Sequence, residues 1–152
     1  MRSVIQRVSE ASVSIENKIV SKINTGLLIL LGIELEDTKE DSLWLANKIA
    51  QLRIFSDFDG KMNNSIIDID GEVIVVSQFT LHAKTKKGNR PSYINAARPE
   101  QAIPLYNQFK RDLSKLISKE VRSGEFAAVF GWQSRCAGGH LHPAEESPAL
   151  RE

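Results

Sequence analysis

An almost unbroken apolar segment follows Gly26 and reads Leu27-Leu28-Ile29-Leu30-Leu31-Gly32-Ile33. In a strand, successive side chains point to opposite faces of the sheet, so a segment without polar residues has both faces buried. Its short length and its glycine and acidic boundaries favour a strand over a helix. We therefore expect a central strand over residues 27–33.

The flanking segments also have the patterns of β-strands. Two alternating segments lie within residues 4–15, residues 16–18 supply a turn, and alternation resumes over residues 19–23. Asn17 is the turn residue best able to take a left-handed conformation. This arrangement predicts a hairpin. Further along, Glu72-Val73-Ile74-Val75-Val76-Ser77 is a β-branched run typical of a second interior strand.

Two helices are predicted. Thr38 and Asp41 resemble a capping box, and the apolar residues that follow them recur at helical spacing. A second helix covers about residues 99–118. Pro99 suits the first helical position, whereas Pro104 leaves open a start at that residue instead. Strands with interspersed helices and hairpin turns favour an α+β domain with a mainly antiparallel sheet and two principal helices.

Composition sets limits on the class of protein. The chain has 152 residues, of which 41% are hydrophobic and 26% charged, which is typical of one globular domain. The single cysteine, Cys136, excludes an intrachain disulfide and indicates a reducing compartment. The longest apolar run is far below the roughly 20 residues of a membrane span, and no signal-peptide pattern begins the chain. We expect a soluble, cytoplasmic protein without a membrane partner.

Positive charge is distributed unevenly. The net charge of +1 does not suggest a general nucleic-acid binder. One segment without Asp or Glu nevertheless contains five cations, namely Lys84, Lys86, Lys87, Arg90 and Arg98. Such a patch can contact phosphates locally, although a solvated surface loop is the simpler interpretation.

The residues after the second interior strand carry the candidate chemistry. Ser77-Gln78-Phe79-Thr80-Leu81 places polar groups where a buried strand ends, and His82 follows. Backbone N–H groups freed at a strand end can hold a carbonyl oxygen as it gains negative charge during acyl transfer. A Thr80–His82 dyad is an alternative, because residues two apart share a face if the strand continues. A third interpretation is a strand end whose hydroxyls bond to nearby backbone groups.

The same pentapeptide resembles the Ser-Gln-Phe-Thr-Leu signature of D-aminoacyl-tRNA deacylases, the D-Tyr-tRNA deacylase family. Other segments resemble that family in the same order: Gln6-Arg7-Val8 with Ala11-Ser12-Val13, Gly26 to Gly32, Arg53-Ile54-Phe55 with Gly60-Lys61-Met62-Asn63, Gly88-Asn89-Arg90-Pro91-Ser92, and Gly124-Glu125-Phe126-Ala127-Ala128. The resemblance spans residues 1–128, which we interpret as a deacylase-like domain.

The resemblance implies a barrel-like core, a homodimer and an activity. The implied activity is hydrolysis of the ester between a D-amino acid and the 3′-terminal adenosine of tRNA, with no metal or other cofactor. Backbone amides of Gln78, Phe79 and Thr80 are implied to polarise the ester, assisted by the 2′-hydroxyl of the terminal ribose. Ser77 is implied to position this segment.

The resemblance also implies binding residues. Arg7 and Phe126 are assigned to the substrate pocket, where Arg7 helps to fix a loop of the partner subunit. The residues assigned to tRNA binding are Lys84, Lys86, Lys87 and Arg90.

Residues 129–152 depart from the family. Family members continue into a final strand and an Asn-x-Gly-Pro-Val-Thr loop, which enters the partner's pocket and excludes L-aminoacyl groups. This chain lacks the motif, since its later prolines, Pro143 and Pro148, follow His and Ser. We expect a divergent, poorly ordered tail, with loss of the final core strand, the cross-subunit loop and the chirality filter.

Two alternatives accompany this interpretation. Cys136, His140 and His142 offer only three metal ligands, and their spacing matches no known zinc turn, so no metal site is predicted. A relative that binds the acceptor end of tRNA without catalysis is the alternative function.

Overall fold

The computed structural model of the chain describes residues 1–86, 88–124, 130–136 and 141–142. Its helices are α1 (Lys39–Gln51), the short 3-10 helix η1 (Phe79–His82) and α2 (Pro99–Ile117). Its strands are β1 (Arg2–Ile15), β2 (Lys18–Ile23), β3 (Gly26–Gly32), β4 (Phe55–Ser56), β5 (Met62–Asn64), β6 (Glu72–Ser77), β7 (Arg122–Ser123), β8 (Phe130–Cys136) and β9 (Leu141–His142).

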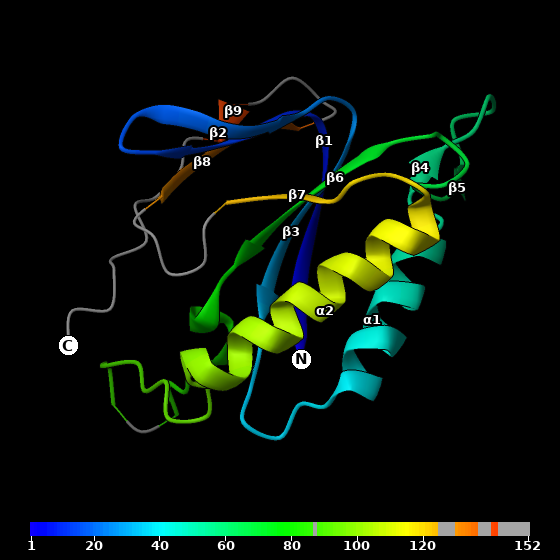
Figure 1. Cartoon of the computed structure of the whole chain (residues 1–152). Helices are drawn as coiled ribbons and strands as arrows, with labels where there is room; N and C mark the ends of the chain where they lie inside the picture. Colours follow the sequence, from blue (N-terminus) through cyan, green and yellow to red (C-terminus); the bar gives the residue numbers. More distant parts are fainter. Residues whose placement is uncertain (87, 125–129, 137–140, 143–152) are drawn as a thin grey trace.

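The main sheet has the order β7-β6-β3-β1-β8-β9, and β2 pairs with β1. Strand β1 pairs antiparallel with β2, β3 and β8, whereas β3–β6 and β6–β7 are parallel. The first half of β1 lies along β3, and its second half carries β2 and β8 (Figure 1). The expected mainly antiparallel sheet is confirmed, and its interior strand β3 begins and ends one residue before the expected range 27–33.

Strand β3 separates two hydrophobic cores. Leu27, Ile29 and Leu31 pack toward α1 and α2, which lie together on one face of the sheet (Figure 1). Leu28 points the other way, into a cluster formed with residues of β1, β2 and β6, namely Val8, Ala11, Val13, Ile23, Ile74 and Val76. Because β1 and β2 wrap over this second face, the sheet encloses apolar side chains as a barrel does. This agrees with the barrel-like α+β core that the resemblance implied.

Both predicted helices are present. The capping box at the start of α1 is complete, because the Thr38 N–H donates to Asp41 and the Asp41 N–H donates to the Thr38 hydroxyl. Hydrogen bonds from the Thr38 backbone and hydroxyl lower the pKa of Asp41. Helix α2 begins at Pro99 and contains Pro104, so the alternative start at Pro104 is wrong. Burial of Phe109 and the rest of its apolar face offsets the backbone hydrogen bond that Pro104 removes.

The expected loss of the final core strand is also wrong. The backbone of Phe130–Cys136 forms β8, which pairs with β1 from Ile15↔Phe130 to Val8↔Cys136. Strand pairing uses backbone N–H and C=O groups, which nearly any sequence supplies, so a divergent segment can still pair along β1. The division at residue 128 and the order of the tail stay predictions, and residues 137–140 and 143–152 lie outside the described residues.

No helix in the described part of the chain is long and apolar enough to cross a membrane.

Candidate active site

The chain changes direction at the end of β6. Ser77 is the last strand residue and pairs with Leu31 of β3. The backbone N–H of Gln78 continues this ladder by donating to the carbonyl oxygen of Leu31 at 2.8 Å. The amide of Gln78 is therefore committed to the sheet. This departs from the expectation that Gln78, Phe79 and Thr80 all offer free N–H groups.

The next two amides lie in η1 and are not used in this way. In a 3-10 helix each N–H bonds to the carbonyl three residues earlier, so the first donors have no partner within the helix. The N–H of Leu81 takes the Gln78 carbonyl at 3.3 Å, and the N–H of Ala83 takes the Thr80 carbonyl at 3.1 Å. No described residue accepts a hydrogen bond from the N–H of Phe79 or Thr80. Both residues are half-buried.

Thr80 and His82 do not form a dyad. The side-chain amide of Gln78 donates to the Thr80 hydroxyl. Each residue of a 3-10 helix turns the chain by about 120°, so residues two apart no longer share a face. His82 is buried at 2% exposure, and neither of its ring nitrogens has a hydrogen-bond partner among the described residues. The dyad required the strand to continue, and η1 begins there instead.

The basic segment leaves directly from η1. Backbone hydrogen bonds join Lys84 to Ser92, with the Lys84 N–H donating at 2.8 Å and the Ser92 N–H at 3.0 Å. The Tyr93 ring meets the Phe79 ring edge-on, with centroids 5.1 Å apart, and this contact holds the base of the loop against the candidate site. The exposed cations of this loop are Lys84, Lys86 and Arg90, while Lys87 lies outside the described residues.

Arg7, one of the two predicted pocket residues, is not brought to η1. Arg7 pairs with Leu27, whereas Ser77 pairs with Leu31. Four residues of strand separate these rows, which is about 13 Å at roughly 3.3 Å per residue. The Arg7 guanidinium instead donates to the carbonyl of Ile54 at 2.7 Å. Phe126 lies outside the described residues.

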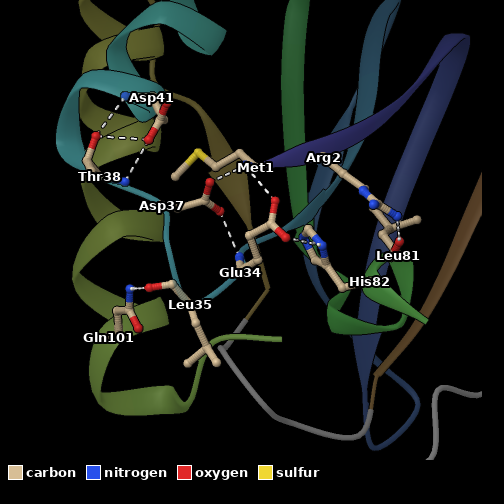
Figure 2. Close-up of polar contacts among 10 residues, drawn as sticks. All are labelled: Met1, Arg2, Glu34, Leu35, Asp37, Thr38, Asp41, Leu81, His82 and Gln101. Carbon is tan, nitrogen blue, oxygen red and sulfur yellow. Dashed lines mark hydrogen bonds and ion pairs between the residues drawn. The ribbon is translucent and has the colours of Figure 1, made fainter. Parts of the chain in front are cut away.

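Two side chains that the sequence did not single out do contact η1. Arg2 donates from Nη1 to the carbonyl of Leu81 at 3.1 Å (Figure 2). Glu34 places Oε2 3.6 Å from Nδ1 of His82. Leu31 of β3 pairs with Ser3 on one side and with Ser77 on the other, so the first residues of β1 lie level with the end of β6. This register is the signal that could have identified Arg2 as a neighbour of η1. That register, however, is not readable from spacing alone.

Acidic and cationic groups gather beside this contact. The amino group of Met1 contacts Asp37 and lies 3.8 Å from Oε1 of Glu34, and the backbone N–H of Glu34 donates to Asp37 at 2.7 Å (Figure 2).

Within the residues that the structure describes, no three His, Cys, Asp or Glu side chains gather as metal ligands. The candidate ligand His140 lies outside that part of the chain.

Comparisons with known proteins agree with the fold and with the family that the sequence resembles. The model of a family described as D-Tyr-tRNA(Tyr) deacylase matches residues 4–138, which covers all but the first three residues of the expected segment 1–128 and also includes β8. A D-aminoacyl-tRNA deacylase of Akkermansia muciniphila is 62% identical over 128 residues, covering 84% of this chain and 85% of that protein. The protein of that name from Bacteroides fragilis is 59% identical over the same shares.

Two solved structures share the architecture. A protein titled c-Myc DNA Unwinding Element Binding Protein is 37% identical, with a TM-score of 0.84, covering 98% of this chain and 100% of that chain. A probable eukaryotic D-amino acid tRNA deacylase is 16% identical with a TM-score of 0.74, covering 93% and 97%, and shows likeness of fold alone. The family match over most of the chain and the close relatives lead to one conclusion: this chain belongs to the D-Tyr-tRNA(Tyr) deacylase family.

Proposed function

We propose that this chain hydrolyses the ester that joins a D-amino acid to the 3′ end of tRNA, and so removes D-amino acids from translation. The relatives named D-aminoacyl-tRNA deacylase support the substrate class. The observation that carries the chemistry is the pair of N–H groups of Phe79 and Thr80, which are free of the sheet ladder and of described acceptors. Two such donors suit an ester oxygen that becomes negative as the carbonyl is attacked.

In the proposed reaction, water adds to the ester carbonyl while the N–H groups of Phe79 and Thr80 hold the oxygen. The bond to the ribose 3′-oxygen then breaks, that oxygen takes a proton, and a free D-amino acid leaves. The neighbouring 2′-hydroxyl assists this transfer. Ser77 pairs with Leu31 at the end of the strand, and the Gln78 side-chain amide donates to the Thr80 hydroxyl. The proposed reaction uses neither the Ser77 nor the Thr80 hydroxyl as a nucleophile.

The basic loop is the proposed contact for the tRNA backbone. Lys84, Lys86 and Arg90 are exposed beside η1, and Lys87 belongs to the same loop. Contacts with phosphates release counterions, so binding is expected to weaken steeply with salt. We place the protein in the cytoplasm, where aminoacyl-tRNA is made and used.

The proposed assembly is a homodimer in which Arg7 and Phe126 serve the substrate pocket. Arg7 pairs with Leu27, whereas Ser77 pairs with Leu31, so Arg7 does not lie beside the end of β6. Its proposed role, which the family resemblance implies, is to hold a loop of the second copy. This chain lacks the Gly-Pro sequence of that loop. We therefore propose that any remaining activity discriminates weakly between D- and L-aminoacyl esters.

The test is deacylation of D-Tyr-tRNA and L-Tyr-tRNA, with the Akkermansia muciniphila relative as a positive control. We expect cleavage of the D-ester and detectable cleavage of the L-ester. No cleavage of the D-ester, under conditions where the control is active, would remove the proposed activity. Cleavage of the D-ester with strict rejection of the L-ester would remove only the proposed loss of selectivity.

Nucleic-acid binding without catalysis is the second candidate function. It is favoured by the 37% identical structure, whose title names a DNA-element-binding protein. This function predicts salt-sensitive binding of uncharged tRNA or DNA and no turnover of either ester.

A further inference from the structure

We propose that Gly32, His82 and Arg2 are positioning residues, which together fix η1 against the end of β3 and so set the direction of the Phe79 and Thr80 N–H groups. This inference rests on the proposed function and extends it to residues outside the signature segment. A donor pair accelerates acyl transfer only if it is aimed at the oxygen before the reaction begins. A turn of only four residues therefore needs contacts from neighbouring elements to hold it in place.

Gly32 supplies the surface on which the turn rests. A Cβ added to Gly32 would lie 2.9 Å from Cδ2 of His82, 3.0 Å from the carbonyl oxygen of Gln78 and 3.0 Å from Cβ of Leu81. All three atoms belong to η1 or to the residue before it. The φ angle of Gly32 is not in the left-handed region, so close packing, rather than backbone strain, is what requires glycine there. Any side chain at residue 32 would push the turn outward.

His82 fixes the buried side of the turn. Its ring lies against Gly32, and its Nδ1 is 3.6 Å from Oε2 of Glu34. That separation is too long for a hydrogen bond, but it allows an electrostatic contact when the imidazole is protonated. Glu34 is in turn held by its own backbone N–H, which donates to Asp37. The imidazole thus lies between Gly32 at the end of β3 and the carboxylate of Glu34.

Arg2 fixes the exposed side. Its guanidinium donates to the Leu81 carbonyl, one of the last acceptors of the turn, and it comes from β1 rather than from β3 or β6 (Figure 2). A cationic donor at the carbonyl end of a helical turn is favourable both as a hydrogen bond and as a charge. Because Arg2 is exposed, its removal should leave the cores intact.

The experiment compares kcat and KM for D-Tyr-tRNA in Arg2→Ala, Arg2→Lys and Gly32→Ala. Gly71→Ala is the matched glycine control, at the residue just before β6. A Cβ added to Gly71 would also collide, but only with side-chain atoms of Ile66 and Ile69. Lys22→Ala is the charge control, since its partner is the exposed Glu10. Melting temperatures are measured for all five variants.

Gly32→Ala is expected to lower kcat at least about tenfold, because the turn must shift by a few tenths of an ångström and a shift of about one ångström costs about a hundredfold. Arg2→Ala is expected to lower kcat about three- to tenfold at unchanged KM, since it removes one exposed charge-assisted hydrogen bond, and Arg2→Lys should recover part of the loss. Both controls should keep the wild-type kcat. Unchanged kcat in Gly32→Ala, or a loss no larger than in Gly71→Ala, would overturn the proposal, as would an Arg2→Ala defect confined to KM.

A second readout separates this inference from the activity itself. In protein labelled with 15N-phenylalanine and 15N-threonine, the amide signals of Phe79 and Thr80 should move in Arg2→Ala and Gly32→Ala but not in the two controls. Unmoved signals would contradict the positioning role even in an active enzyme. An inactive wild type would defeat the proposed function, and the amide signals alone would then decide whether these residues hold the turn.

Discussion

The two ends of strand β6 differ in whether their backbone N–H groups have hydrogen-bond acceptors. At its start, the Glu72 N–H donates to the Thr25 carbonyl at 3.1 Å, and the Glu72 carboxylate accepts the Asn24 N–H at 2.7 Å. At its end, the ladder stops with the Gln78 N–H, and the following Phe79 and Thr80 N–H groups meet no described acceptor. One strand therefore has a closed end that serves stability and an open end that offers donors to a ligand.

The largest expected effect comes from breaking the closed end. In Gly26→Ala the added Cβ would collide with the backbone nitrogen, carbon and oxygen of Glu72, none of which can move without opening the β3–β6 pairing. We expect the free energy of unfolding to fall by about 3 kcal/mol or more, as in the more severe cases of overpacking. Urea denaturation measures it. A wild-type midpoint for this variant would show that the two strands are not packed as described.

A smaller effect is expected at the loop beside the open end. Replacing Lys84, Lys86 and Arg90 together by Ala removes up to three phosphate contacts. tRNA affinity should fall at least about tenfold at low salt, and the slope of log K against log salt should become shallower. Filter binding over a salt series measures both quantities. The matched variant Lys18→Ala/Lys22→Ala, on β2, should change neither, and equal losses in the two variants would contradict a local binding surface.

Thr80→Ala should have a modest effect. The variant keeps the backbone N–H and loses only a hydroxyl that accepts a hydrogen bond from the Gln78 side chain. We expect kcat for D-Tyr-tRNA to fall by less than about tenfold, the value of one neutral hydrogen bond. Loss of all turnover would instead identify Thr80 as a nucleophile.

The smallest effect is expected at the closed end, in Glu72→Ala. This change removes one side-chain acceptor, so the free energy of unfolding should fall by about 0.5–1.5 kcal/mol, with kcat unchanged. A thermal melt together with a deacylation assay tests both halves of this statement. A marked fall in kcat would mean that the two ends of β6 are coupled, contrary to the separate roles proposed for them.

Local pattern predicted much of this fold. The apolar run over residues 27–33 and the β-branched run over residues 72–77 correspond to β3 and β6, and Thr38 with Asp41 marked the start of α1. Such features depend on neighbours in sequence, which spacing records. Strand β8 was missed because pairing with β1 depends on backbone groups rather than on a hydrophobic period.

The candidate site was only partly predictable. The signature segment located the end of β6, but it did not show that the Gln78 amide would remain in the ladder or that η1 would separate Thr80 from His82. Arg2 reaches Leu81 across 79 positions of sequence, through a register that no local pattern encodes. Contacts of this kind follow from sheet topology, which is fixed only when the whole chain has folded.

The proposed chemistry needs a main-chain donor that polarises the ester, and Phe79→Pro compared with Phe79→Ala removes that donor alone. Both variants lose the ring, but only proline also removes the N–H. Proline suits the first position of a helical turn, and Gln78, with φ −140° and ψ 83°, has a backbone compatible with a following proline. We expect a kcat for D-Tyr-tRNA about 10²–10³-fold lower in Phe79→Pro than in Phe79→Ala. Equal kcat values in the two folded variants would contradict it.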